Sequence, residues 1–132
     1  MQKLPKGPTE VGGADRFIGQ VFLDPIAVGE PPSRVRASIV HFTPGARNAW
    51  HAHAQGQWLY VTDGIGRTQS RGGPMVEIRA GDTIHADPGE WHWHGAAPDH
   101  FMTHLALWEA PAEGAESEWG DQVSDAEYNP GG

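Results

Sequence analysis

Two pairs of histidines, each pair separated by a single residue, are the residues of this sequence best suited to chemistry. His51 and His53 form the first pair, and His92 and His94 form the second. Because side chains alternate along a β-strand, both imidazoles of such a pair point to one face of a strand. His104 lies in another apolar, strand-like run. This spacing predicts that several imidazoles converge on one interior point, as they do around a divalent metal ion.

A structural role is the alternative for any single histidine, because buried imidazoles commonly serve as hydrogen-bonded core residues. The sequence holds eight histidines in 132 residues. Five of them form the two pairs and His104, and this set is neither contiguous nor terminal, as a histidine-rich tail would be. We therefore favour metal binding for the set.

The composition limits the classes of partner. The chain has 9 basic and 17 acidic residues and a formal net charge of −8, which argues against nucleic acid as a partner. It has no cysteine, which excludes disulfides and thiolate metal ligands. No run approaches the ~18 apolar residues of a membrane span, and the first residues lack a signal-peptide core. We expect a soluble cytoplasmic protein that binds a small molecule and no membrane.

The rest of the sequence predicts short strands that are separated by turns rich in glycine and proline. The expected strands cover residues 17–23, 34–42, 58–62, 65–70, 75–78, 83–86, 91–95 and 101–109. No stretch of the core shows a helical apolar period. The pattern predicts a single all-β domain, a sandwich or barrel, over residues 15–110. Residues 1–14 form a flexible N-terminal arm in this prediction, and residues 111–132 form an acidic C-terminal segment that could hold one short helix at 121–128.

The strand expected at 101–109 is apolar on both faces. Met102, Ala106 and Trp108 share a face with His104, whereas Leu105 and Leu107 lie on the opposite face. A strand with one face in water would alternate more clearly. Either the N-terminal strand or a second subunit must cover the outer face, and we expect a homodimer or a higher homo-oligomer.

Both histidine stretches resemble the two sequence motifs of the cupin family. The first motif is met by Gly45, His51, His53 and Gly64, with Gln57 where the family usually has glutamate. The second is met by Gly81, Gly89 and His92, with Asp87 at the proline position and Ala96 at the asparagine position. The resemblance implies a cupin-type jelly-roll β-barrel (a double-stranded β-helix). It also implies one divalent metal ion bound through His51, His53, Gln57 and His92.

Residues 44–53, 89–98 and 102–106 resemble small bacterial cupins that include manganese-dependent hydroxynitrile lyases. That resemblance implies manganese, although nitrogen and oxygen ligands also suit iron, nickel, copper or zinc. It places two further histidines near the metal, which correspond to His94 and His104. We expect the substrate pocket to be lined by Ser38, Val40, Trp58 and Trp108.

Three imidazoles and one amide leave the charge of a divalent ion uncompensated, which makes the ion a stronger Lewis acid than a glutamate ligand would. His104 is expected to act as a pocket base, and His94 could be either a base or a residue that orients a metal ligand. The leading interpretation is a lyase that cleaves or forms a small hydroxynitrile or a related α-hydroxy or carbonyl compound. One alternative is an iron or copper cupin dioxygenase, and another is a non-catalytic cupin that binds a small ligand or a metal.

Overall fold

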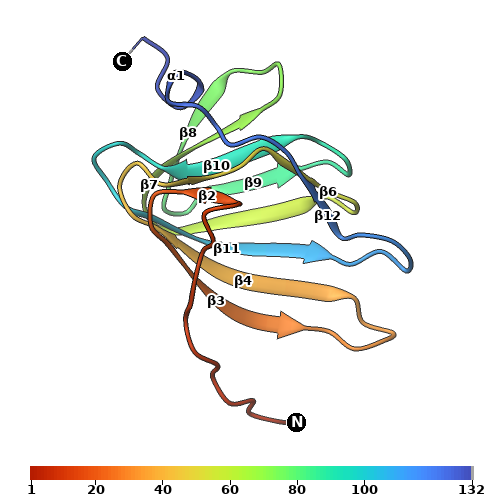
Figure 1. Cartoon of the computed structure of the whole chain (residues 1–132). Coiled ribbons are helices and arrows are strands. Elements are labelled where there is room, and N and C mark those ends of the chain that lie inside the picture. The colour runs from red at the N-terminus through yellow and green to blue at the C-terminus, as the bar shows by residue number, and fades with distance from the viewer. Residues whose placement is uncertain (132) are drawn as a thin grey trace.

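The computed structural model describes residues 1–131. Two β-sheets that share one long strand enclose the interior of the protein (Figure 1). The first sheet runs in the order β1 (Glu10–Val11), β3 (Val21–Val28), β4 (Val35–Phe42), β11 (Met102–Glu109), β7 (Gln57–Ser70) and β9 (Thr83–Ala86). The second runs β2 (Phe17–Ile18), β5 (Arg47–Asn48), β10 (His92–Ala96), β7 and β8 (Met75–Arg79). Beyond β5 on the same edge of β10 lies β6 (His51–His53), which pairs with β12 (Ser117–Trp119). The all-β prediction is confirmed.

Strand β7 is continuous across Gly64, where the sequence predicted two separate strands. Its first half pairs with β11 and β9, and its second half pairs with β10 and β8. Gly64 has a φ of +83°, and a Cβ added there would lie 2.0 Å from the carbonyl oxygen of Phe101. Only glycine suits such a position. The residue thus lets one strand pass from the first sheet into the second.

The first long strand also differs from the prediction, which ended it before Pro25. The chain forms the short β2, turns, and continues as β3 through Pro25 to Val28. Proline lacks a backbone donor and is tolerated where a strand edge is unpaired. On that side of β3, the partner strand β1 reaches only Phe22 and Leu23, so Pro25 lies beyond it. A register shift between Pro25 and Ala27 accommodates the ring.

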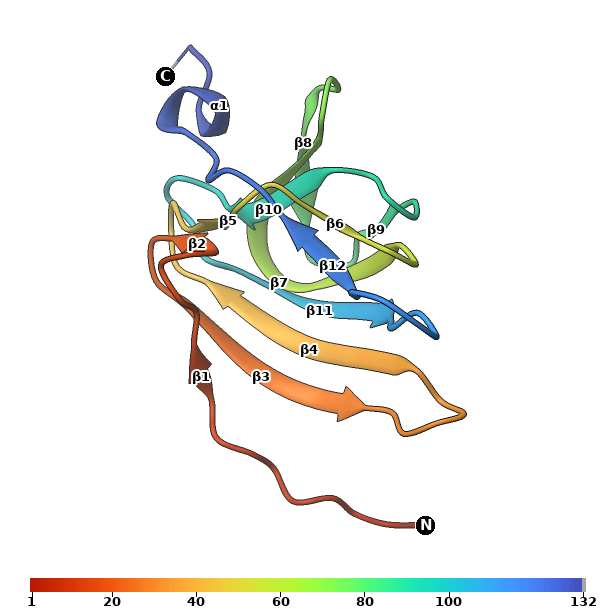
Figure 2. The ribbon, with the colours of Figure 1, turned by 45° about the vertical axis from the view of Figure 1, so that its right-hand side comes forward.

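The N-terminal segment joins the two sheets. Strand β1 lies along β3, as Figure 2 shows, and the chain then crosses to β2 in the second sheet. We call residues 10–17 the N-terminal strap. Hydrogen bonds fix both of its ends, from the Gly12 amide to the Val21 carbonyl and from the Ala49 amide to the Arg16 carbonyl. The flexibility expected for residues 1–14 stays a prediction.

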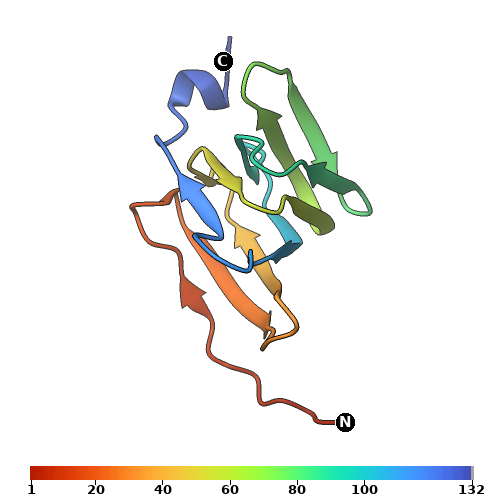
Figure 3. The same cartoon turned by 90° about the vertical axis from the view of Figure 1, so that its right-hand side faces the viewer.

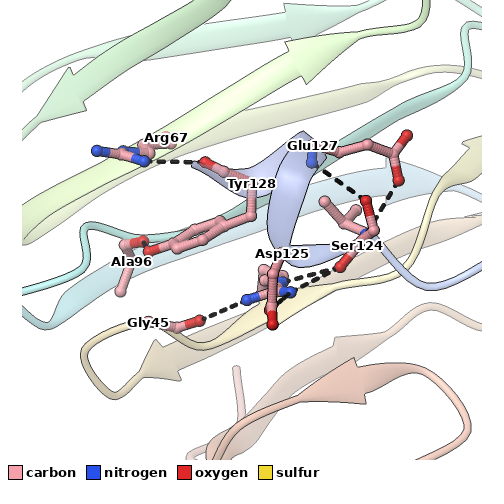
Figure 4. Close-up of polar contacts among 9 residues, drawn as sticks. Gly45, Arg67, Ala96, Ser124, Asp125, Glu127 and Tyr128 are labelled. Carbon is pink, nitrogen blue, oxygen red and sulfur yellow. Dashed lines mark hydrogen bonds and ion pairs between the residues drawn. The ribbon is translucent and has the colours of Figure 1, made fainter. Parts of the chain in front are cut away.

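The C-terminal segment contains strand β12 and a one-turn helix, α1 (Asp125–Tyr128), so the helix is shorter than the 121–128 expected. Ser124 and Glu127 form a capping box at its start. Figure 4 shows how it is anchored: the Tyr128 hydroxyl donates to the Ala96 carbonyl (2.5 Å), and Arg67 donates to the Tyr128 carbonyl (2.9 Å). Val123 and Tyr128 are buried, so the acidic segment is tied to the barrel. Within residues 1–131, no helix has the length and apolar character of a membrane span.

Alternation along the strands divides the first sheet into an inner and an outer face. Ser38, Val40 and Phe42 of β4 are buried in the interior. The two termini lie at opposite ends of the molecule (Figure 3).

The strand nearest the N-terminus that could cover β11 does not do so, because β3 pairs edge to edge with β4 in the same sheet. Among the described residues, no strand therefore covers the outer face of β11, where Leu107 is 37% exposed. The sequence suggested that either the N-terminal strand or a second subunit covers this face, and the structure excludes the N-terminal strand.

Candidate metal centre

Three histidines from two strands meet in the interior. His51 and His53 point inward from β6 and His92 points inward from β10, and all three side chains are buried. His51 and His92 are direct cross-strand partners, with ring centroids 4.4 Å apart. One nitrogen of each ring lies within 4.8 Å of the others, close enough to share one ion. The spacing of two in each pair achieves this convergence because both strands present alternate residues to the interior.

Backbone carbonyls orient two of these rings. The Nδ1 of His51 lies 2.8 Å from the Ala49 carbonyl, and the Nδ1 of His92 lies 2.8 Å from the Glu90 carbonyl. Each Nδ1 must therefore carry the proton and donate it. This leaves the Nε2 lone pair of each ring free for an electrophile, as in most histidine metal sites.

Gln57 and His53 complete the donor set. The Oε1 of Gln57, at the start of β7, lies 3.0 Å from the Nε2 of His92. Both ring nitrogens of His53 are buried, and neither has a hydrogen-bond partner among the described residues. An unpartnered buried polar group is costly unless something else binds it. The four side chains therefore fit a divalent metal ion.

Burial keeps this cluster neutral. It lowers the pKa of His53 to about 4, lowers that of His92, and holds that of His51 well below its usual value. A protonated imidazole cannot bind a metal ion, because its lone pair is occupied. The folded chain thus presents three neutral imidazoles near neutral pH, each with one ring nitrogen whose lone pair is free.

Beside the cluster lies a second pair of rings, His94 from β10 and His104 from β11. The Nε2 of His104 is 2.9 Å from the Nδ1 of His94, so one ring donates a hydrogen bond and the other accepts it. Burial lowers the pKa of His104 to about 3 and that of His94 well below its usual value. Asn48 accepts from the backbone amide of His94 (2.9 Å), which turns its side-chain nitrogen toward that ring, 3.1 Å from Nδ1.

His51, His53 and Gln57 line one cavity of about 530 Å³ together with His94 and His104. Three of the four predicted pocket residues line it as well: Ser38, Val40 and Trp108. The prediction for Trp58 was wrong. Gln57 points into the cavity, so the next residue along the strand must point outward. The Trp58 side chain is 52% exposed and packs against His85 on the outer face, with ring centroids 4.1 Å apart.

Several cavity residues escaped the sequence analysis. Trp119 of β12 stacks on His51, with ring centroids 4.6 Å apart, and the Arg16 guanidinium lies 4.7 Å from the Trp119 ring centre. Phe17 of the strap and Glu116 also line the cavity. Arg16, Glu116 and Trp119 lie outside the predicted strands, so no periodicity marked them, and Phe17 was predicted only as the first residue of a strand. Asn48 gave one unused signal, because Arg47 and Asn48 form a polar pair between Ala46 and Ala49 just before the first histidine pair.

The sequence matches the cupin domain model over residues 38–107. It is also 47% identical over 117 residues to an (R)-mandelonitrile lyase from Granulicella tundricola, which covers 89% of this chain and 88% of that protein. That relationship supports the resemblance to the small cupin hydroxynitrile lyases.

Solved structures agree with this assignment. A cupin-like protein from Thermotoga maritima superposes with a TM-score of 0.85 at 34% identity, over 97% of this chain and 95% of that one. A polyketide cyclase from Streptomyces resistomycificus shares the fold at 18% identity, with a TM-score of 0.68 over 97% of this chain and 90% of its own. With its two histidine stretches on adjacent strands of a jelly-roll barrel, the chain belongs to the cupin family.

Proposed function

We propose that this cupin is a metal-dependent lyase that cleaves or forms a small cyanohydrin. One observation carries the proposal: the hydrogen-bonded pair His94–His104 lines the same cavity as His51 and His53 of the three-histidine cluster. A metal-binding protein without a reaction needs only the cluster. A lyase also needs a group beside it that can take a proton and return it. The 47% identity to a protein named (R)-mandelonitrile lyase supports the same choice of reaction.

Four neutral side chains would hold the ion in this proposal: His51, His53, Gln57 and His92. A bound divalent ion would act as a Lewis acid toward an oxygen of the substrate, because no ligand charge offsets its own. We propose manganese, and the same nitrogen and oxygen donors also suit iron, nickel, copper or zinc. The absence of cysteine makes a thiolate-bound ion impossible.

His94 and His104 would move the proton. The ring of His94 is the nearer of the two to the cluster, 5.2 Å from His51 between centroids, and His104 lies behind it at 4.7 Å. In cleavage, His94 takes the hydroxyl proton and passes its Nδ1 proton to His104 through their hydrogen bond, while the carbon–oxygen double bond forms and the bond to the nitrile carbon breaks. The departing cyanide then receives that proton, so the products are an aldehyde and hydrogen cyanide.

The depressed pKa values suit this transient role. A group of low pKa is a weak base, which would suffice for a substrate hydroxyl if a bound cation lowered the pKa of that hydroxyl. Its conjugate acid gives the proton up readily to cyanide. The apolar part of the cavity, which includes Leu23, Val40 and Ala106, would take the hydrocarbon side chain of the substrate.

The direct test is aldehyde release from racemic mandelonitrile by protein that is loaded with manganese, with metal-free protein as the control. We expect release only from the loaded protein. Chiral analysis of the remaining substrate would give the enantiomer preference. If the loaded protein releases no more aldehyde than buffer, the lyase proposal is refuted. Oxygen uptake with an iron-loaded or copper-loaded sample would then test the dioxygenase alternative.

We also propose that two copies associate through the outer face of the first sheet. Trp58 and Leu107 are cross-strand partners there, as are Tyr60 and Leu105, and Ile39 continues the second row on β4. Trp58 and Tyr60 are 52% and 47% exposed. Large contiguous apolar surfaces of this kind favour association over exposure to water.

A further inference from the structure

One carboxylate joins three elements at the mouth of the cavity. Glu116 lies immediately before β12 and lines the cavity. Its Oε1 accepts a hydrogen bond from the indole Nε1 of Trp108 (2.9 Å), and its Oε2 accepts one from the Nε of Arg36 (3.2 Å). Its own backbone carbonyl accepts from the amide of Ala54, the residue that follows β6. The acidic C-terminal segment therefore contributes a group to the site.

The hydrogen bond to Glu116 orients the ring of Trp108. Its ring lies 5.7 Å from that of His53 between centroids, so the indole forms the wall of the cavity next to one proposed metal ligand. Trp108 and Arg36 are cross-strand partners, and Glu116 bonds to both side chains. An indole has a single donor, and in an apolar wall that donor needs an acceptor. Without the carboxylate, the indole would lose the hydrogen bond that holds its ring in the present orientation.

We propose that Glu116 is a positioning residue that sets which substrate side chains the cavity admits. Through its bond to Trp108 it holds the indole as a fixed wall, so that a phenyl-sized group fits beside Ala106 and a larger one does not. This inference rests on the proposed lyase function for its choice of substrates. It assigns a specificity role to a residue whose carboxylate is hydrogen-bonded to Arg36 and Trp108 rather than to a proposed metal ligand or to the His94–His104 pair.

The test compares two substrates in three variants of the manganese-loaded protein. The substrates are mandelonitrile and the cyanohydrin of 2-naphthaldehyde. Glu116→Ala removes the acceptor, whereas Glu116→Gln keeps an acceptor oxygen for Trp108. Glu118→Ala is the matched control, because it removes the same charge from an exposed position two residues away. Circular dichroism and metal content verify that each variant is folded and loaded.

We expect Glu116→Ala to shift the ratio of the two kcat/KM values toward the larger substrate by about tenfold, the effect of a modest change in a hydrophobic pocket. The change should lie mainly in KM, and Glu116→Gln and Glu118→Ala should keep the wild-type ratio. In a Trp108→Phe background, Glu116→Ala should change the ratio no further, because its effect passes through the indole. An unchanged ratio in Glu116→Ala, or an equal shift in Glu118→Ala, would overturn the inference.

Measurements of aldehyde binding distinguish a failure of this inference from a failure of the lyase proposal. Calorimetry gives the Kd values of benzaldehyde and 2-naphthaldehyde for each loaded variant, and it requires no turnover. If wild-type protein is inactive but Glu116→Ala shifts the ratio of the Kd values, the positioning role stands and the lyase proposal falls. If wild-type protein is active and neither ratio shifts, the positioning role falls alone. If wild-type protein neither binds the aldehydes nor turns over, both fall.

Discussion

Replacing His104 with glutamine separates proton transfer from packing. The side chain of His104 is fully buried, and its Nε2 lies 2.9 Å from the Nδ1 of His94. Glutamine can place an amide group near the position of Nε2 and keep a hydrogen bond to His94, yet it cannot carry a proton. The structural loss is then mainly the ring contact with Phe42, whose centroid lies 5.4 Å away. We expect the free energy of unfolding to change by about 1 kcal/mol.

The expected loss of activity is much larger. General acid–base catalysis contributes about 10²–10⁴-fold, or about 3–5 kcal/mol of activation free energy. Turnover of mandelonitrile by the manganese-loaded variant should therefore fall by about that factor, while the variant keeps its metal. The assay follows aldehyde release, with metal content and a denaturant titration of the same samples. His100→Gln is the control, since that ring is 54% exposed in a turn.

Wild-type turnover in the metal-loaded His104→Gln variant would refute the proton-transfer argument, and His104 would then be a packing residue. A loss of metal together with activity would also count against it, because the structure places His104 behind His94 rather than in the donor set.

Three further predictions follow from the same geometry. Purified protein should bind about one divalent ion per chain, and His51→Ala or His92→Ala should each release it in a metal analysis, since each removes one of few ligands; full retention by both would contradict the donor set. Light scattering should show a homodimer that Leu107→Glu converts to a monomer, and a monomeric wild-type protein at high micromolar concentration would exclude this interface. The third prediction concerns acid. Because burial lowers the pKa of His104 from 6.5 to about 3, the unfolded chain binds this proton more readily, and stability is lost as the pH falls below 6.5. In metal-free protein, His104→Gln should lessen the decline in unfolding free energy between about pH 6.5 and 5, by up to about 2 kcal/mol; equal declines in both proteins would mean that His104 does not titrate there.

Strand alternation explains both a success and an error of the sequence analysis. The spacing of two in His51–His53 and in His92–His94 places all four rings inward, as the structure shows. The same rule, applied from Gln57, would have placed Trp58 on the outer face. That residue was assigned to the pocket by its type rather than by its parity. The information needed for the correct placement was in the sequence.

The N-terminal and C-terminal contributions to the site were not predictable in this way. Strand β12 has three residues in an acidic, glycine-rich segment, and it exists because β6 offers it an unpaired edge. A segment this short has no periodicity to detect. The bonds of Glu116 to Arg36 and Trp108 span 80 and 8 residues of sequence. Contacts of this kind follow from the way the curled sheets bring distant strands together and not from local preference.

The residues that line the cavity come from two parts of the chain, one inside the cupin match and one outside it. The cupin match spans residues 38–107, and that span holds all four proposed metal donors and both histidines of the proposed proton-transfer pair. Phe17, Glu116 and Trp119 line the same cavity from outside the span. A fold that is shared by a mandelonitrile lyase and a polyketide cyclase does not itself choose a substrate. We infer that the barrel strands supply the reaction, whereas the segments that cross the cavity mouth decide which molecule reaches it.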